Sequence, residues 1–185
     1  MLWTMGCLCK IRWEPAPRRN RQKGTYMETD HFPYTIRWAL PEDWDPAMDM
    51  VWRTFLKFEG KDYSQEGIDN FDTFIHDGTL RKLFLKGRYQ VMLALDGSLV
   101  VGLASVRSGN HLSLLFVDER YHRRGIGRTL MRGLCQYLER EAGEHSMTLT
   151  AAPYAVDFYK KLGFYSIKPE EQISGIRVTS MEKYF

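Results

Sequence analysis

Short stretches in which apolar and polar residues alternate recur along the chain and predict β-strands. Pro41 ends the first of these stretches, because proline cannot donate to a strand ladder. Asp96 and Gly97 separate two others and form a dipeptide typical of a tight hairpin turn. The sequence therefore predicts a sheet with at least one antiparallel hairpin. The predicted strands are residues 34–39, 89–95, 98–106, 110–117, 146–150 and 175–184.

Apolar residues three and four positions apart predict two helices between the first strand and the hairpin. The second is expected from near Ser64 to Ile75. The first carries a stripe of large apolar side chains, which we interpret as core packing in preference to the lining of a substrate pocket. This stripe consists of Trp44, Met48, Val51, Trp52 and Phe55.

Two more helices are predicted in the second half of the chain. One opens at Gly125 and has a single apolar face made by residues 126, 130, 134 and 138. A shorter one begins after Pro153, since proline suits the first position of a helix. It ends at Gly163, where a left-handed cap is expected.

Residues 114–128 carry the clearest chemical signal in the chain. An apolar run that predicts a strand leads through a charged turn into Gly125 and Gly127, which are flanked by arginines. A strand that leads into a glycine-rich helix start presents free main-chain N–H groups and the positive end of the helix dipole. Glycine lets an anion approach the main chain closely. The pattern therefore predicts a phosphate-binding loop.

Two common kinds of phosphate-binding loop do not fit this stretch. A Walker loop needs Gly, four residues and then Gly-Lys-Ser/Thr, and that string does not occur in the sequence. A dinucleotide-binding loop would need glycine at Leu130 and an acidic residue about 20 positions further on, where the chain has Met147. Hydride transfer with a nicotinamide cofactor is therefore disfavoured.

Residues 114–130 resemble the acyl-CoA signature of the GCN5-related N-acetyltransferase (GNAT) family. In that signature a strand ends in Val and is followed by Gln or Arg, two residues, Gly, one residue, and Gly or Ala; here the last three fixed positions are His122, Gly125 and Gly127. A second stretch, residues 155–164, resembles the A-x-x-F-Y-x-K-x-G-F helix and strand start of the same family. The two motifs together are more specific than either alone.

This sequence departs from the family pattern at two positions. His122 stands where Gln or Arg is usual, which leaves a hydrogen-bond donor but weakens that contact. Ala152 stands where Asn is usual, so one side-chain contact to the pantetheine arm is missing. The resemblance implies a mixed α/β fold whose central, mostly antiparallel sheet splays apart partway, with helices on both faces. It also implies acetyl-CoA as co-substrate and a homodimer formed through the C-terminal strand region.

The resemblance further implies which residues bind the donor. Main-chain groups of the strand before the loop would pair with the pantetheine amides as an added strand would. The glycines and arginines would hold the pyrophosphate, although the arginines alone also fit a solvated basic rim. The implied donor-binding residues are Leu115, Phe116, Val117, His122, Arg123, Arg124, Gly125, Ile126, Gly127, Arg128, Thr129 and Tyr159.

Three residues are the leading candidates for catalysis. Taken alone, Tyr159 fits a core residue, but the resemblance places it at the thioester sulfur, where it can hydrogen-bond or protonate the departing thiolate. The resemblance likewise makes the N–H near Leu115 the donor to the carbonyl oxygen. Glu59 is the first candidate base, and an exposed acid at a helix end is its alternative interpretation. Further candidates are Asp62, Tyr63, Glu66, His111 and Asp118.

Charge is distributed unevenly over the 185 residues. Residues 1–27 hold six Lys or Arg and one acid, so of the formal net charge of +3 they carry +5 and the rest of the chain −2. We expect residues 1–27 to be a disordered basic extension and residues 28–185 to form one acyltransferase domain. Cys7 and Cys9 have no partner cluster, so no metal is expected. Cysteine usage fits a reducing cytoplasm, and no apolar stretch reaches membrane-spanning length.

Three functions remain open at this stage. The first is an N-acetyltransferase that acts on a small-molecule or peptide amine, and its acidic residues would suit a cationic acceptor such as a polyamine, an aminoglycoside or a Lys side chain. The second is an acyl-CoA sensor without turnover, which the missing Asn at Ala152 favours slightly. The third is nucleic-acid binding through the basic extension, which lacks a recognition motif and is not expected.

Overall fold

The computed structural model describes residues 32–107, 109–173 and 176–185. Its α-helices are α1 (Trp44–Phe58), α2 (Gln65–His76), α3 (Gly78–Leu85), α4 (Ile126–Tyr137) and α5 (Val156–Lys160). Its strands are β1 (Thr35–Trp38), β2 (Gln90–Asp96), β3 (Leu99–Arg107), β4 (His111–Val117), β5 (Ser146–Ala151), β6 (Tyr165–Ser166), β7 (Glu171–Ile173) and β8 (Ile176–Tyr184). Short 3₁₀ turns are η2 (Pro41–Asp43), η3 (Gly60–Asp62), η4 (Glu119–Tyr121) and η6 (Pro153–Ala155), and η5 (Leu138–Ala142) is a π-helical turn.

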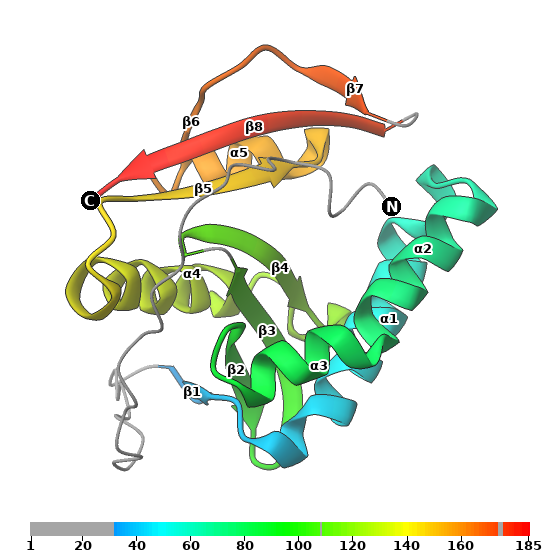
Figure 1. Ribbon diagram of the computed structural model, residues 1–185, viewed down its shortest axis with the longest axis vertical. Coiled ribbons are helices and arrows are strands. Elements are labelled where there is room, and N and C mark those ends of the chain that lie inside the picture. Colours follow the sequence, from blue (N-terminus) through cyan, green and yellow to red (C-terminus); the bar gives the residue numbers. More distant parts are fainter. Residues whose placement is uncertain (1–31, 108, 174–175) are drawn as a thin grey trace.

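The strands form one sheet in the order β1-β2-β3-β4-β5-β8-β6, with β7 paired to β8. All neighbours are antiparallel except β4 and β5, which run parallel and pair at one position, His111 with Thr148. Beyond that pair the two strands diverge, and Figure 1 shows β5 and β8 turning away from β4. The sheet therefore consists of two halves that meet at one narrow junction and leave a gap beyond it.

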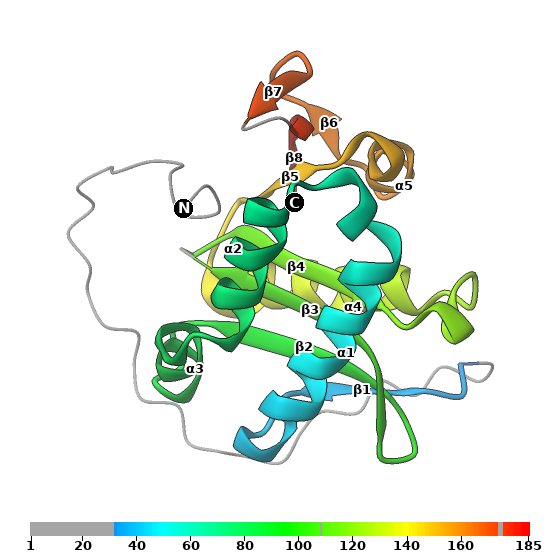
Figure 2. The ribbon, with the colours of Figure 1, turned by 90° about the vertical axis from the view of Figure 1, so that its right-hand side faces the viewer.

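Helices cover both faces of the sheet. Figure 2 shows α1 and α2 in front of β2, β3 and β4, with α4 behind them. Each face has its own hydrophobic core, because β2 and β3 bury side chains of both orientations. Four of the five stripe residues on α1 are buried in the core under α1–α3 and Trp52 is half-buried, so they pack as the spacing predicted.

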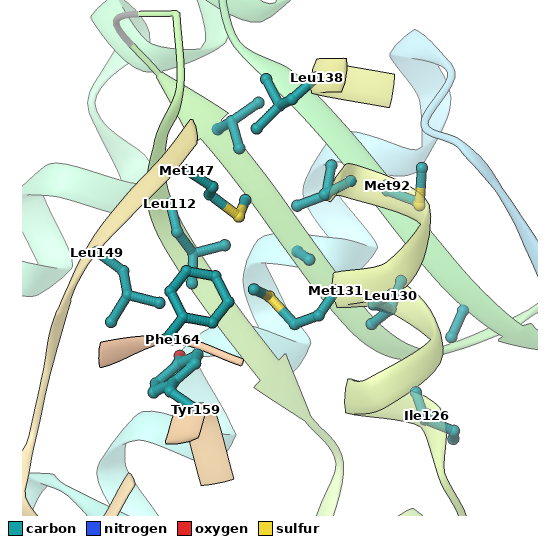
Figure 3. Close-up of a cluster of buried hydrophobic side chains, with 14 of the residues drawn as sticks. Met92, Leu112, Ile126, Leu130, Met131, Leu138, Met147, Leu149, Tyr159 and Phe164 are labelled. Carbon is teal, nitrogen blue, oxygen red and sulfur yellow. The ribbon is translucent and has the colours of Figure 1, made fainter. Parts of the chain in front are cut away.

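The position of α4 depends on close contact with the sheet. A Cβ on Gly102 of β3 would lie 2.8 Å from Cγ2 of Ile126, and one on Gly133 would lie 2.6 Å from Sδ of Met92. The apolar face of α4 (Ile126, Leu130 and Leu134) and Leu138, which continues it in η5, are at most 1% exposed. These side chains belong to one cluster with Met147 and Leu149 of β5 and Tyr159 of α5, and Figure 3 shows Leu130 and Met131 of α4 on one side of it. The helix that begins at the predicted loop is thus fixed against both halves of the sheet.

The sequence predicted most of these elements, and the mixed α/β fold with a splayed sheet is confirmed. The predicted hairpin forms, but Asp96 pairs with Leu99, so the two turn residues are Gly97, at φ 59°, and Ser98, and not Asp96 and Gly97 as expected. The helix α3 and the strands β6 and β7 were not predicted separately. The predicted extension, residues 1–27, lies outside the described residues, and so does Gly175 at the start of the last predicted strand.

Candidate active site

The gap between β4 and β5 exposes main-chain groups of β4. Hydrogen-bonded and non-hydrogen-bonded pairs alternate along an antiparallel ladder. The N–H of Asp118 donates to the carbonyl of Val101 on β3 at 2.9 Å. The alternation therefore turns the N–H and C=O groups of Val117 and Leu115 away from β3, toward the gap. These are two of the three strand residues expected to pair with the pantetheine arm; the third, Phe116, has its main chain directed at β3.

The loop between β4 and α4 contains two residues whose main chain has a positive φ angle. Arg123 has φ 62° and Gly125 has φ 83°, and Gly125 is the N-cap of α4. Such a turn directs successive N–H groups toward one point, and the first N–H groups of the helix add to them. A turn of this kind at a helix start favours the binding of an anion. Arg123 holds a backbone conformation that costs a non-glycine residue about 1 kcal/mol.

Two side chains of this loop, those of His122 and Arg124, already have partners within the protein. His122 places Nε2 2.7 Å from the carbonyl oxygen of Val117, and its ring lies 5.1 Å from that of Phe58. Arg124 donates to the Tyr34 hydroxyl at 3.1 Å and lies over the ring of Tyr121. The loop is therefore held from both sides of the sheet.

The first turn of α4 presents the remaining predicted residues. Thr129 donates its hydroxyl to the carbonyl of Gly125 at 3.1 Å, while Arg128 is exposed. A Cβ on Gly127 would lie 3.5 Å from Phe158 of α5 and 3.8 Å from Val117, so the helix start, β4 and α5 converge there. Ile126 is buried beneath them.

A groove of about 550 Å³ extends from this turn along the side of α4. It does not include Tyr159; it follows α4 away from the gap. Its charged lining residues are mostly basic, which suits the phosphorylated end of a ligand better than its reacting end. They are Arg128, Arg132, Arg140, Lys161, Lys183 and the acidic Glu139.

Tyr159 lies where α5 meets the β5 half of the sheet. Its side chain is 8% exposed and packs beside Phe164, as Figure 3 shows. Burial and, secondarily, the negative charge of Glu59 raise the pKa of Tyr159 above the range in which phenols usually ionise. The phenol therefore keeps its proton at neutral pH.

Glu59 lies at the end of α1, on the other side of the gap from α5. Its Oε1 accepts a hydrogen bond of 2.7 Å from the hydroxyl of Tyr154, which is on η6. Although the Tyr154 side chain is 65% exposed, burial near its hydroxyl and the charge of Glu59 raise the pKa of Tyr154 as well. The structure thus brings Glu59 and Tyr159, 100 positions apart in the sequence, within electrostatic reach of each other.

Tyr154 was not among the residues predicted from the sequence. The signal that was available is its position directly after Pro153 at the end of β5 and five residues before Tyr159. A 3₁₀ turn between strand and helix makes that position project across the gap. A tyrosine in a turn has many explanations, which is why pattern alone did not single it out.

The other candidate bases have different surroundings. The carboxylate of Asp118 is bound by the main chain and guanidinium of Arg120, which hold its pKa below the usual range. His111 lies at the closed end of the gap, where Nδ1 is 2.9 Å from the Thr148 hydroxyl. Glu66 is exposed at the start of α2, and the side chain of Asp62 is not among those described. Tyr63 is half-buried against Phe55 and acts electrostatically on Tyr154.

Comparison with known proteins identifies the family to which this fold belongs. The sequence model of the acetyltransferase (GNAT) domain matches residues 59–185. The Escherichia coli (strain K12) N-acetyltransferase YafP is 31% identical over 135 residues, which cover 73% of this chain and 83% of that protein. A solved GCN5-related N-acetyltransferase from Rhodopseudomonas palustris has a TM-score of 0.68 at 25% identity, covering 81% of this chain and 94% of that one. The PaiA N-acetyltransferase from Thermoplasma acidophilum, solved with coenzyme A, has a TM-score of 0.70 at 19% identity, covering 82% and 99%.

The chain belongs to the GNAT acetyltransferase family. The resemblance identified from residues 114–130 and 155–164 is therefore confirmed, and the protein is an acetyl-CoA-dependent N-acetyltransferase. Within the described ranges no helix is both long and apolar enough to cross a bilayer. The same residues contain no group of three His, Cys, Asp or Glu side chains arranged to hold a metal ion.

Proposed function

We propose that this enzyme acetylates a primary amine of a small molecule or peptide by direct attack while both substrates are bound. The observation that carries the proposal is that Glu59 lies within electrostatic reach of Tyr159, beside the gap toward which the N–H of Leu115 points. A carboxylate, a protonated phenol and a main-chain donor around one opening are the groups that this reaction needs.

The donor would lie along β4 with its phosphates at the start of α4. The C=O of Leu115 and the N–H of Val117 would pair with the pantetheine amides, since the carbonyl of Val117 already lies 2.7 Å from Nε2 of His122. The N–H groups around Gly125 and Gly127 would hold the pyrophosphate. Ile126 would contribute its N–H, and Arg123 and Arg128 positive charge. The basic groove beside α4 suits the remaining phosphate of coenzyme A. This arrangement does not depend on the Asn side chain that is usual in the family at the position of Ala152.

Acetyl-CoA supplies an acetyl thioester whose C–S bond breaks as the C–N bond of the amide forms, with one proton released overall. Glu59 would take a proton from the ammonium form of the acceptor, because only the neutral amine has a free electron pair. The N–H of Leu115 would donate to the carbonyl oxygen as negative charge develops on it. Tyr159 would hydrogen-bond or protonate the departing sulfur.

The charges of these groups couple the two proton transfers. The negative charge of Glu59 is one of the two causes that raise the pKa of Tyr159. Once Glu59 has taken up the proton of the amine, that cause is removed, and Tyr159 becomes a better proton donor. Proton uptake by the base would thus favour proton release by the acid.

A cationic acceptor fits the acceptor side of the gap. Glu59 supplies negative charge there, and residues 28–185 carry a formal net charge of −2. One of the similar solved structures is a spermidine N-acetyltransferase chimera of Vibrio cholerae, at 18% identity, which shares the fold. The acceptor classes that we propose are a polyamine, an aminoglycoside and a Lys-containing peptide. The proposal also includes a cytoplasmic homodimer formed through the C-terminal strand region.

The proposal is tested by measuring thiol release from acetyl-CoA with one acceptor of each class. Saturable release that depends on one of these amines is the expected result. A calorimetric titration with acetyl-CoA accompanies the screen. Binding of acetyl-CoA without turnover of any amine would favour an acyl-CoA sensor, and no binding at millimolar acetyl-CoA would contradict the assignment of the loop.

A Tyr159→Phe variant tests the catalytic assignment. Removing the hydroxyl should lower kcat by about 100-fold, the lower range for loss of a general acid. Acetyl-CoA should still bind with the affinity of the wild type in the same titration, since the ring that packs beside Phe164 is retained. Unchanged turnover would show that Tyr159 is a core residue.

A further inference from the structure

Tyr154 is a large aromatic residue in a place that core packing does not explain. Its side chain is 65% exposed, whereas the other tyrosine of this segment, Tyr159, is 8% exposed. The exposed ring nevertheless directs its hydroxyl to one acceptor, Oε1 of Glu59, at 2.7 Å. This is a hydrogen bond to a carboxylate between residues 95 positions apart.

Glu59 lies at a position where an ionised carboxylate needs a hydrogen-bond donor to stabilise it. It is the C-cap of α1, and its N–H donates to the carbonyl of Phe55 at 2.8 Å. The C-terminal end of a helix carries partial negative charge, which disfavours a neighbouring carboxylate. A phenol hydroxyl that donates to the carboxylate offsets this effect and restricts its rotamers.

The bond also spans the open side of the sheet. The strands β4 and β5 pair only at His111 and Thr148, and they diverge beyond that pair. Tyr154 comes three residues after the end of β5, on η6, while Glu59 belongs to the half of the molecule that contains α1 and β4. The Tyr154–Glu59 bond therefore joins the two halves where the main chain no longer does.

We propose that Tyr154 is a positioning residue that holds the Glu59 carboxylate across the open end of the gap, facing Tyr159. The proposal rests on the role of Glu59 given under the proposed function. Besides Glu59, two titratable groups act on Tyr154: Tyr63, which follows η3, and Tyr159 on α5. A fixed carboxylate would receive the ammonium group of every acceptor in the same place, at a constant distance from Tyr159.

The experiment compares Tyr154→Phe, Glu59→Gln and the double variant, with spermidine and hydroxylamine as probe acceptors. Hydroxylamine is largely neutral near pH 7, so it needs no base, whereas spermidine amines are protonated there. Tyr165→Phe is the matched control, because Tyr165 is also exposed but stacks on Tyr184 in the β6–β8 region. Melting temperatures and acetyl-CoA titrations confirm that each variant is folded.

Tyr154→Phe should lower kcat/KM for spermidine by about ten-fold, as expected for the loss of one hydrogen bond to a charged group. The acid limb of the spermidine pH profile should move to higher pH. The Tyr154 hydroxyl stabilises the ionised carboxylate of Glu59, so its removal makes that carboxylate easier to protonate. Turnover of hydroxylamine and the KM for acetyl-CoA should stay close to the wild-type values. In the Glu59→Gln background Tyr154→Phe should have no further effect, because it acts through Glu59.

Two outcomes would overturn this inference and leave the proposed function in place. Wild-type kinetics in Tyr154→Phe, together with impaired Glu59→Gln, would remove the positioning role and leave the base in place. An additional loss in the double variant would show that Tyr154 acts on the substrate directly. Full spermidine turnover in Glu59→Gln would contradict the role of Glu59 as the base, and with it the role of Tyr154, while the absence of thiol release with every one of the three acceptor classes would contradict the proposed function itself.

Discussion

His111 is the residue at which the two halves of the sheet meet. It forms the single β4–β5 pair with Thr148, and its Nδ1 is 2.9 Å from the Thr148 hydroxyl. Burial and, secondarily, the positive charge of Arg107 lower the pKa of His111 from 6.5 to about 4. The junction therefore contains a neutral imidazole that resists protonation in the folded state.

This perturbation predicts a loss of stability in mild acid. Between pH 6.5 and about 4 the unfolded chain binds a proton at His111 that the folded protein does not. The free energy of unfolding should be fully retained above pH 6.5 and should fall by up to about 3 kcal/mol as the pH drops toward 4. Urea denaturation at a series of pH values measures this, and His111→Gln, which can still hydrogen-bond to Thr148, is the control. A variant with the same pH dependence as the wild type would contradict the prediction.

The role of a single residue was predictable where a sequence motif fixes its main-chain conformation. It was less predictable where a side chain contacts a residue distant in the sequence. Gly125 was expected at a helix start close to a bound anion, and it is the left-handed N-cap of α4. The contact of Glu59 with Tyr154 was not predicted, because residues 95 positions apart meet only through the topology of the sheet. Asp118, one of the weaker candidate bases, is bound to Arg120 two residues away, a pairing that many turns allow.

At the scale of elements, α4 is the helix on which the donor site depends. Gly102 lies beneath it, and a Cβ there would be 2.8 Å from Cγ2 of Ile126 and 3.2 Å from Cδ1 of Leu130. Ile126 is the first residue of α4 and directly follows Gly125. A shift of α4 away from β3 would therefore move the loop that we expect to hold the pyrophosphate.

Two glycine substitutions test this packing. Gly102→Ala should destabilise the protein by about 1–3 kcal/mol, because the β-branched Ile126 has little freedom to move away. Gly133→Ala meets the flexible thioether of Met92 instead, and the gain in helix propensity, about 1 kcal/mol, should largely offset that contact. Urea denaturation and acetyl-CoA titration of both variants measure the difference. Equal destabilisation by the two substitutions would show that contact with Ile126 is not what limits the approach of α4.

Elements were predictable where periodicity was long and turn chemistry clear. The hairpin of β2 and β3 and the helices α1, α2 and α4 follow from such patterns. In contrast, α3 has eight residues and one buried side chain, Leu80, so its sequence has no apolar face long enough to predict it. The strands β6 and β7 have two and three residues and exist through pairing with β8, which a local pattern does not contain.

At the scale of the whole molecule, the two halves are held together unequally along their boundary. One strand pair joins them at His111, and the core under α4 receives Met147, Leu149 and Tyr159 from the second half. On the open side, the Tyr154 hydroxyl reaches Glu59. A donor that pairs with Leu115 and Val117 would fill the gap between these connections.

Hydrogen exchange should therefore differ between the halves and respond to the donor. Without ligand, amides of β5 should exchange faster than those of β2 and β3, whose ladders are paired on both sides. Acetyl-CoA should slow exchange in β4 and β5 as well as in the loop around Gly125. Adenosine 3′,5′-bisphosphate, which lacks the pantetheine arm, should protect the loop alone. Equal protection of β4 by the two ligands would contradict the added-strand arrangement.

The single strand pair between β4 and β5 also bears on how long the protein would survive in a cell. The boundary between β4 and β5 is the one that bound acetyl-CoA would close. Molecules without acetyl-CoA would therefore open at this boundary more often and be cleaved by proteases more readily. The amount of enzyme would then rise and fall with the supply of activated acetate, with no dedicated regulatory site. Pulse-chase degradation in cells starved of, and then supplied with, a carbon source would reveal such a link.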